Sequence, residues 1–491
     1  MNASMKHLSL PRTRLTWTCQ ISMECGFVIL LILTGHDATP LFAHDNSTDT
    51  AVEQRTSNSS SVATDKSQPD DATSESSEVV SSSLFDGQTL DGWHNPYQWG
   101  DVQIVDGEIH LTSDRKFFLV TDETFHDFEF EGEIKLPPGK SNSGFMARGQ
   151  VEPNRVYGYQ AEADPTERRW SGGLYDESRR QWLNPLWREP AAQAAFDRER
   201  WNRYRIKCVG THLQFFVNEV PTTDYFDPVD LSGRIGLQHH GEKGQTYRFR
   251  NLKVQRLGRH VWKPLFPQQD DAIISLDGWE SIGGGSWSVE DGMIRGRANA
   301  DADEPNGMLV SKQTYGDFTI RLQYRIARGD SGFFVRSRVM SQRPYIEGIQ
   351  CEIDATKDVA GLYHTGGDGW IVRPLHYLNT FPPERHDVVR NSWRQAQAGI
   401  PLSRQKTSRK APKRQPTHSN SKPSDDLNDA PWQTLVVTVF GQRIVTRLNG
   451  CLASDVTVET LPDEGVIGLQ LHGGQDLAVD FRVVEILAPT H

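Results

Sequence analysis

The sequence predicts an all-β protein that consists of two tandem antiparallel sandwiches. Three observations lead to this prediction: an internal repeat of about 175 residues, short segments in which apolar and polar residues alternate, and glycines at the turns between these segments. A unit of this length is too long for a solenoid repeat and matches the size of an independent domain. The 41 glycines and 13 tryptophans of the 491-residue chain agree with a β-rich protein that has many turns.

The repeat consists of motifs that return in the same order. In the first copy they are LDGW (90–93), NSGFMARG (142–149), GYQAEAD (158–164), GGLYD (172–176), GRIGLQHHG (233–241) and FRNLKV (249–254). In the second copy they are LDGW (276–279), DSGFFVRS (330–337), GIQCEID (348–354), AGLYH (360–364), GVIGLQLHG (465–473) and FRVVEI (481–486). The ordered set indicates the tandem duplication of one domain.

Within each copy the residue pattern is that of β-strands. Residues 127–136 and 317–326 alternate apolar and polar side chains. Residues 204–220 and 434–450 are typical of hairpins, with turns at Gly210-Thr211 and Gly441-Gln442. Helical periodicity is weak except around residues 190–201. Many short strands with glycine turns predict an antiparallel two-sheet sandwich.

The segments around the two copies differ from them in composition. We expect a signal peptide or N-terminal anchor over residues 1–43, because basic residues precede the short apolar run GFVILLILTG. We expect a disordered tether rich in Ser, Thr and Asp over 44–83, the first sandwich over 84–257, a linker over 258–273 and the second sandwich over 274–488. These expectations predict export to the periplasm or the extracellular space, and an uncleaved N-terminal segment would attach the protein to the cell envelope.

The second copy carries a basic insertion at about residues 390–430, which contains the run RQKTSRKAPKRQ. We interpret the insertion as a disordered, solvated loop, with contact to an anionic polymer or surface as the alternative. The whole chain has a net charge of −11, which argues against a nucleic-acid partner because such binding needs a basic face. The spacing of the five cysteines is not that of a metal site. We therefore expect no cofactor, with calcium near Asp164 or Asp354 as the one conceivable metal.

The motif GYQAEAD is notable because its polar residues stand at every second position. On a strand, Gln160, Glu162 and Asp164 would share one face, and the apolar residues between them would face the core. The second copy repeats this pattern with Gln350, Glu352 and Asp354. A solvated outer face would explain one such strand, but it does not require the same residues in both copies.

The other repeated motifs add candidates to the same face of each sheet. If the strands are regular, the first copy would gather a cation, carboxylates, amides and an imidazole: Asn142, Arg148, Gln160, Glu162, Asp164, Gln238 and His240. The second copy would gather Asp330, Arg336, Gln350, Glu352, Asp354, Gln470 and His472. Tyr175 and Tyr363 of the GLY motifs would line the same cleft or fill a turn. Such a set can transfer protons and bind the hydroxyl groups of a sugar.

Taken in order, these motifs resemble the 3-keto-disaccharide hydrolase domain family, formerly domain of unknown function 1080. The resemblance covers about residues 84–257 and 274–488. It implies a concanavalin A-like, glucanase-like jelly-roll sandwich in each copy. It also implies an exported bacterial protein that binds an oligosaccharide or keto-sugar and cleaves 3-keto-glycosides.

The reaction implied by the resemblance begins at the carbon next to a ketone. The C3 ketone acidifies the proton on C2, a base removes this proton, the glycosidic oxygen leaves C1, and water adds to the double bond. Glu162 or Asp164 would be the base, His240 the acid, and Arg148 and Gln160 would stabilise the enolate. Glu352, Asp354 and His472 are the counterparts in the second copy. We favour the first copy as the catalytic one because it follows the family pattern more closely.

Two alternative functions remain open from the sequence. Glu162, Asp164 and Glu167 spell E-x-D-x-x-E, which resembles the catalytic strand of a retaining glucanase. Such an enzyme needs two carboxyl groups close together. The other alternative is a non-catalytic, bivalent carbohydrate-binding or cell-surface protein, in which two linked sites would raise avidity.

Overall fold

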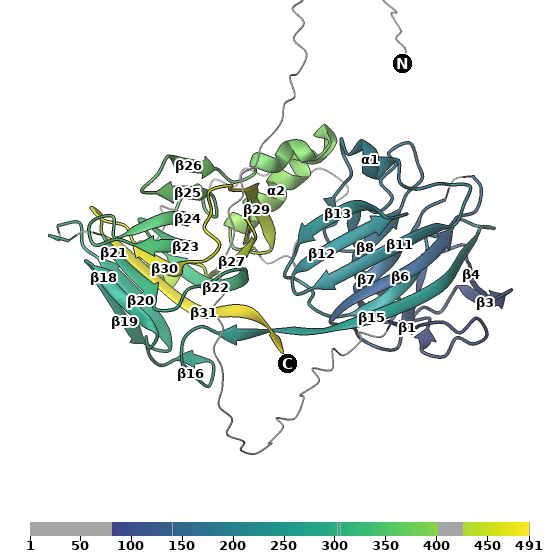
Figure 1. The fold of residues 1–491 in the computed structure, drawn as a ribbon, viewed down its shortest axis with the longest axis horizontal. Coiled ribbons are helices and arrows are strands. Elements are labelled where there is room, and N and C mark those ends of the chain that lie inside the picture. Colours follow the sequence, from purple (N-terminus) through teal and green to yellow (C-terminus); the bar gives the residue numbers. More distant parts are fainter. Residues whose placement is uncertain (1–80, 140, 302, 305, 401–425, 491) are drawn as a thin grey trace, which may run out of the picture. The chain divides into compact units, whose positions relative to one another are not determined.

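The computed structural model describes residues 81–490 apart from 140, 302, 305 and 401–425 (Figure 1). The predicted signal or anchor segment and nearly all of the predicted tether lie outside the described residues. Ser81–Ser83, which we assigned to the tether, form strand β1 and pair with residues 253–255. The first sandwich therefore begins slightly earlier than predicted. Among the described residues, no helix has the length and apolar character needed to span a membrane.

The first sandwich consists of two antiparallel sheets. One sheet has the order β13 (Val220–Phe226), β12 (His212–Val217), β11 (Asn202–Val209), β6 (Asp127–Lys135) and β15 (Thr246–Pro264), and β4 (Glu108–Thr112) joins β15 to β3 (Asp101–Val105). The other sheet, which carries the candidate site, has the order β10 (Gln181–Asn184), β9 (Leu174–Glu177), β8 (Arg155–Ala163), β7 (Ser143–Glu152), β14 (Arg234–His239), β5 (Phe117–Thr121) and β2 (Trp93–His94).

The second sandwich repeats this arrangement. One sheet has the order β29 (Cys451–Thr457), β28 (Arg443–Leu448), β27 (Gln433–Phe440), β22 (Phe318–Ile326), β31 (Leu477–Thr490), β20 (Met293–Ala298) and β19 (Ser286–Glu290). The other has the order β26 (Gly369–Val372), β25 (Leu362–Thr365), β24 (Ile346–Asp354), β23 (Asp330–Val339), β30 (Val466–Leu471), β21 (Gly307–Ser311) and β18 (Trp279–Gly283). The site-bearing sheets correspond strand for strand. The predicted fold class, two tandem concanavalin A-like jelly-roll sandwiches, is confirmed.

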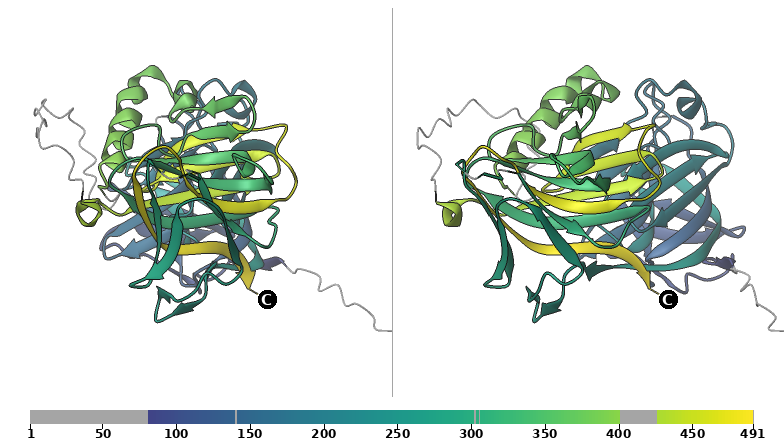
Figure 2. Two further views of the ribbon diagram at one scale, coloured as in Figure 1. Left: turned by 90° about the vertical axis from the view of Figure 1, so that its left-hand side faces the viewer. Right: turned by 60° about the vertical axis from the view of Figure 1, so that its left-hand side comes forward.

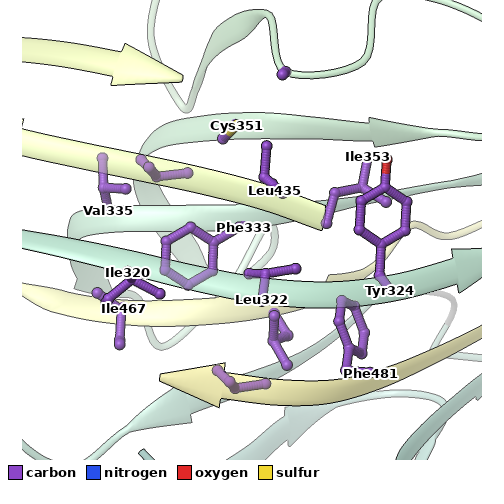
Figure 3. Close-up of a cluster of buried hydrophobic side chains, with 14 of the residues drawn as sticks. Ile320, Leu322, Tyr324, Phe333, Val335, Cys351, Ile353, Leu435, Ile467 and Phe481 are labelled. Carbon is purple, nitrogen blue, oxygen red and sulfur yellow. The ribbon is translucent and has the colours of Figure 1, made fainter. Parts of the chain in front are cut away.

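The apolar half of each alternating strand packs the core, as predicted. Tyr159, Ala161 and Ala163 of β8 are fully buried in the first sandwich. In the second sandwich Cys351 and Ile353 of β24 point among apolar side chains from several strands (Figure 3). The two hairpin turns also lie where we predicted them, because Val209 pairs with His212 and Phe440 pairs with Arg443. Predicted helical periodicity around residues 190–201 corresponds to the short helix α1 (Pro190–Gln193).

Two predicted irregular segments are ordered in the structure. Residues 258–264 of the predicted linker belong to β15, and Arg259–Pro264 pair with Glu485–Thr490 of β31 (Figure 1). The rest of the linker contains β16 (Gln268–Gln269) and β17 (Ala272–Ile273). The first part of the predicted disordered insertion belongs to helix α2 (His386–Gln397), which is drawn in light green (Figure 2). Trp393 and Ala396 of this helix pack into the second core. The linker prediction was wrong for residues 258–264 and the disorder prediction was wrong for residues 390–397, because pairing and burial supply stabilisation that local composition does not show. Residues 401–425 of the predicted insertion lie outside the described residues.

Candidate active site

Three neighbouring strands bring the repeated polar residues together in the first sandwich. On β7 and β8, Gly144 pairs with Glu162 and Met146 pairs with Gln160. Gln160 in turn pairs with Tyr175 of β9. Paired residues project from the same face of a sheet, so Glu162, Gln160 and Tyr175 share one face, as the alternation predicted.

Glu162 is the most strongly perturbed acid on this face. Its side chain is buried, with 6% of the residue exposed. Oε1 accepts a hydrogen bond from Asn142 Nδ2 at 2.7 Å, and Oε2 accepts one from Gln160 Nε2 at 2.9 Å. Burial raises the pKa of Glu162 to about 8, the Asn142 hydrogen bond opposes this rise, and the charges of Asp164 and Glu177 add to it. A carboxyl group held in this way can act as a proton acceptor near neutral pH.

An amide pair fixes the side chain that supports Glu162. Gln160 and Gln238 are both buried, and they exchange two hydrogen bonds of 3.1 Å between Nε2 and Oε1. The backbone carbonyl of Gln238 also accepts from the Ser143 hydroxyl at 2.7 Å. Gln160 therefore presents its amide to Glu162 in a fixed orientation. The predicted grouping of Asn142, Gln160, Glu162 and Gln238 exists in the structure.

Asp164 has a different role from its neighbour Glu162. Its Oδ1 accepts from the backbone amide of Thr166 at 3.2 Å, and its Oδ2 lies 2.7 Å from Arg168 Nη2. Asp354, at the same place in the second copy, accepts from the amide and hydroxyl of Thr356. Both aspartates accept hydrogen bonds within the turn that follows the strand. We therefore no longer consider them as the base, and Glu162 and Glu352 remain as candidates.

The predicted placement of Arg148 and Arg336 on this face was wrong. A β-bulge after Ala147 gives Arg148 a φ of 51°, and the side chain is fully buried. Its guanidinium donates to three backbone carbonyls and to Asp127 Oδ1. Arg336, with a φ of 40°, makes the same kind of contacts with Asp317 and three carbonyls. The alternation that we extrapolated along β7 and β23 is interrupted at the bulge.

The structure supplies cations that the sequence analysis missed. Arg168 pairs with Asp164, and its charge lowers the pKa of Glu162. Lys116, directly before β5, forms an ion pair with Glu177 of β9, whose charge raises the pKa of Glu162. One feature of the sequence could have pointed to Arg168, namely a difference between the two copies in the loop that contains it. The loop between the carboxylate strand and the GLY motif reads PTERRWSG in the first copy and ATKDVA in the second.

His240 lies just beyond the end of β14 rather than on the buried face with Gln238. Its side chain is 48% exposed, and Nδ1 is 2.7 Å from Glu242 Oε1. The other oxygen of Glu242 accepts from the Tyr247 hydroxyl at 2.6 Å, and that hydroxyl accepts from the backbone N–H of Asn142 at 3.4 Å. His240 is thus connected to Asn142 through Glu242 and Tyr247.

The second copy has the same glutamate in different surroundings. Glu352 is 7% exposed, and burial together with the charges of Asp330 and Asp354 raises its pKa to about 8. Gln350 Nε2 donates to Glu352 at 3.1 Å. Asp330 stands where the first copy has Asn142, and it contacts His472 at 3.3 Å. Glu352 therefore has a charged neighbour in place of an amide donor.

The tyrosines of the GLY motifs lie on the same face as the glutamates. Tyr175 contacts Trp182 edge to face at 5.2 Å between ring centroids, and Tyr363 contacts Trp370 in the same manner at 5.5 Å. Tyr363 also pairs with Gln350, and Gln350 Oε1 accepts from the Thr365 hydroxyl at 3.2 Å. Gln470, the counterpart of Gln238, is buried on β30, which β23 separates from β24. Both tyrosines line the candidate face.

The remaining predictions concern metals and the glucanase pattern. In the part of the chain that the structure describes, no three His, Cys, Asp or Glu side chains gather as a metal site would require. Glu167 of the E-x-D-x-x-E pattern is exposed in the turn after β8. The carboxylates with the strongest effect on Glu162 are instead Asp164 and Glu177.

Comparison with known proteins assigns the chain to a class and then to a family. The class is that of glycosyl hydrolase-like, carbohydrate-active domains. A family model described as the 3-keto-alpha-glucoside-1,2-lyase-like domain matches residues 81–255 and 261–487. The chain belongs to this family and contains two copies of the domain, as the ordered motifs predicted. No curated protein matches the chain.

Solved structures with similarity to the chain include three from Bacillus. A protein of Bacillus subtilis with a galectin-like fold is 12% identical, with coverage of 36% of this chain and 95% of the other and a TM-score of 0.31. The carbohydrate-binding module CBM66 of Bacillus subtilis is 16% identical, with coverage of 33% and 95% and a TM-score of 0.25. The β-glucanase of Bacillus licheniformis is 12% identical, with coverage of 48% and 100% and a TM-score of 0.27.

Proposed function

We propose that the first copy cleaves the glycosidic bond of a 3-keto-glycoside by elimination, with Glu162 as the base. The observation that carries this proposal is the buried carboxyl group of Glu162, held between Asn142 and Gln160, whose pKa is raised to about 8. A base with a pKa near the working pH is well matched to the removal of a proton next to a ketone. Membership of a family described as 1,2-lyase-like supports the same reaction class.

The proposed reaction has two bond-breaking steps. Glu162 takes the proton from C2, and the electron pair of that bond forms an enolate with the C3 ketone. The enolate then expels the oxygen on C1, so that a double bond forms between C1 and C2, and the leaving oxygen takes a proton. Addition of water to this double bond would give the free 3-keto-sugar. The proposal assigns the proton transfers to side chains and uses no cofactor.

Three further side chains have proposed roles. Gln160 donates hydrogen bonds from a fixed amide, and Arg168 carries a positive charge beside Glu162; both would stabilise the enolate. His240 is the proposed acid for the leaving oxygen, since it is exposed at the edge of the site and connected to Asn142.

The basic and apolar pattern of residues 1–43 supports export as the proposed location.

The second copy is the weaker catalytic candidate for two reasons. It lacks the amide donor, since Asp330 replaces Asn142, and its shorter loop contains no counterpart of Arg168. A negative charge at Asp330 would oppose the ionisation of Glu352 and the build-up of charge on an enolate. The geometry therefore favours the first copy.

The test compares matched glutamine variants in the full chain. Purified protein is incubated with 3-keto-trehalose, trehalose and laminarin, and the products are identified by mass spectrometry. Glu162→Gln should lower the turnover of 3-keto-trehalose by roughly 10²–10⁴-fold, the usual contribution of a general base. Glu352→Gln is the matched control and should retain activity. Loss of activity in Glu352→Gln alone would move the reaction to the second copy, and cleavage of laminarin would establish a classical glycosidase instead.

A further inference from the structure

The two copies differ most visibly at the edge strand of the site-bearing sheet. In the second copy, strands β24, β25 and β26 place Gln350, Tyr363 and Trp370 side by side. Two strand spacings separate the first from the last, or about 10 Å. Trp370 is 37% exposed, whereas its counterpart Trp182 in the first copy is only 8% exposed. An exposed tryptophan thus continues the row that begins beside Glu352.

The difference in exposure follows from the loop before the GLY motif. In the first copy Trp170 stacks edge to face on Trp182 at 4.8 Å, and both belong to an apolar cluster with Leu186 and Ala192. In the second copy the loop is two residues shorter, and Asp358 stands where Trp170 stands. The same backbone hydrogen bond confirms this equivalence, since Gly173 donates to Trp170 and Gly361 donates to Asp358, each at 3.0 Å. Removal of the covering indole exposes Trp370.

The exposed ring is held in a defined orientation. Tyr363 contacts it edge to face, and the guanidinium of Arg373 lies 4.1 Å from its centroid. Arg373 is itself paired with Asp358, the residue that replaces the covering tryptophan. A ring supported in this way loses little conformational entropy when a ligand stacks on it.

The polar groups beside the ring match the hydroxyl groups of a sugar. Gln350 supplies an amide, Thr365 a hydroxyl, and Glu352 a buried carboxyl group. Sugars combine an apolar face of C–H groups with a rim of hydroxyl groups, so an aromatic ring next to amides and carboxyl groups is complementary to them. The row has no cation placed to favour an anionic ligand, because Arg373 is neutralised by Asp358.

We propose that the second copy is a binding site for a neutral saccharide, in which Trp370 and Tyr363 form the stacking platform and Gln350 and Glu352 bind hydroxyl groups. The inference rests on the proposed function in one respect, namely that the first copy performs the chemistry. A chain with one catalytic and one binding copy would hold a polymeric or clustered sugar while the first copy acts on it.

The test measures binding and turnover separately in the full chain. Maltoheptaose and laminariheptaose are the probes, and isothermal titration calorimetry is the measurement. Trp370→Ala should weaken the binding of at least one probe by about tenfold. Val388→Ala, which truncates another exposed apolar side chain, is the control and should bind as the wild type does. Turnover of 3-keto-trehalose should be the same in the wild type and in Val388→Ala.

A second variant covers the platform instead of removing it. Asp358→Trp introduces the counterpart of Trp170 and should weaken binding of the probes, as Trp370→Ala does. Trp370→Phe keeps an aromatic ring and should retain part of the affinity. Absence of binding to both probes in the wild type, or equal affinity in the wild type and Trp370→Ala, would overturn the inference. Binding that depends on Trp370 in a protein without lyase activity would support this site and reject the proposed reaction.

Discussion

At the scale of single residues, two opposing effects act on Glu162. Burial favours the neutral carboxyl group, whereas the hydrogen bond from Asn142 favours the carboxylate. The balance leaves a pKa of about 8, so that a large share of the base is protonated at neutral pH. Glu352 reaches about the same value through burial and the charge of Asp330, without the asparagine.

This balance predicts the pH dependence of the reaction. Because the base must be deprotonated, kcat/KM for 3-keto-trehalose should be low below pH 7 and rise through about pH 8, the pKa of Glu162. A pH profile of kcat/KM between pH 5 and 10 measures this directly. A profile that is flat from pH 6 to 10 would contradict the assignment of Glu162.

Asn142→Asp provides the matched comparison, since it introduces the residue of the second copy. It removes a hydrogen bond to the carboxylate and adds a negative charge, so it should move the rise of the profile to higher pH by about 1–2 units. At pH 7 the activity should fall by roughly 10–100-fold and recover at alkaline pH. A uniform loss at every pH would indicate a role in substrate binding instead.

The sequence predicted much of this site, and the reasons for its failures are physical. Gln160 and Glu162 lie on a regular part of β8, where alternation determines the face. Arg148 lies within a bulge, where one extra residue interrupts the alternation of side-chain directions. Arg168 was missed because it lies in a loop, where no periodicity relates sequence to direction.

At the scale of the strand, Arg148 has a structural role that can be measured. It is buried, donates to three backbone carbonyls and pairs with Asp127 at 3.0 Å. Arg148→Ala would leave three backbone carbonyls without this donor and the Asp127 carboxylate with only His260 and the Gly210 amide as partners, and it should lower the free energy of unfolding by about 3–5 kcal/mol. Arg148→Lys should recover little, because an ammonium group cannot reach all of these acceptors at once.

Urea denaturation followed by circular dichroism measures this effect. Arg155→Ala, which removes an exposed ion pair to Glu152, is the control and should change the stability by less than about 1 kcal/mol. If Arg148→Ala retained wild-type stability but lost activity, the guanidinium would belong to the active site after all.

Regular strands and turns were predictable from the sequence. Whether the segments that join them form regular structure was not. The alternating strands β6 and β22 and both hairpin turns lie where predicted. Residues 258–264 and 390–397 were misjudged because the strand and the helix that they form depend on partners far away in the chain. Composition reports only what a segment would do in isolation.

At the scale of the whole molecule, the two buried glutamates predict how stability depends on pH. Their pKa values are about 8 in the folded protein and near 4.5 when unfolded, so the folded state binds more protons. The contribution of these two glutamates to the free energy of unfolding is fully present below about pH 4.5 and is lost as the pH rises through 8. The free energy of unfolding of the Glu162→Gln, Glu352→Gln double variant should therefore increase relative to that of the wild type as the pH rises from 5 to 9.

The expected change in this difference is on the order of a few kcal/mol for each glutamate. Urea denaturation of both proteins at pH 5, 7 and 9 checks it, and comparison between the two proteins removes the contribution of other titrating groups. A difference that stays constant with pH would mean that the two carboxyl groups ionise normally in the folded protein.

The pairing of β31 with β15 has a consequence for the order in which the protein forms during synthesis. Every strand of the first sandwich lies before Pro264 in the chain, so this sandwich can fold while the ribosome is still translating the second. The second core needs Val479 and Phe481 of β31, which pairs with β20, β22 and the end of β15. Because β31 follows every other strand of the second sandwich in the chain, the second sandwich can close only after β31 has been translated, on an edge that β15 of the first copy already presents.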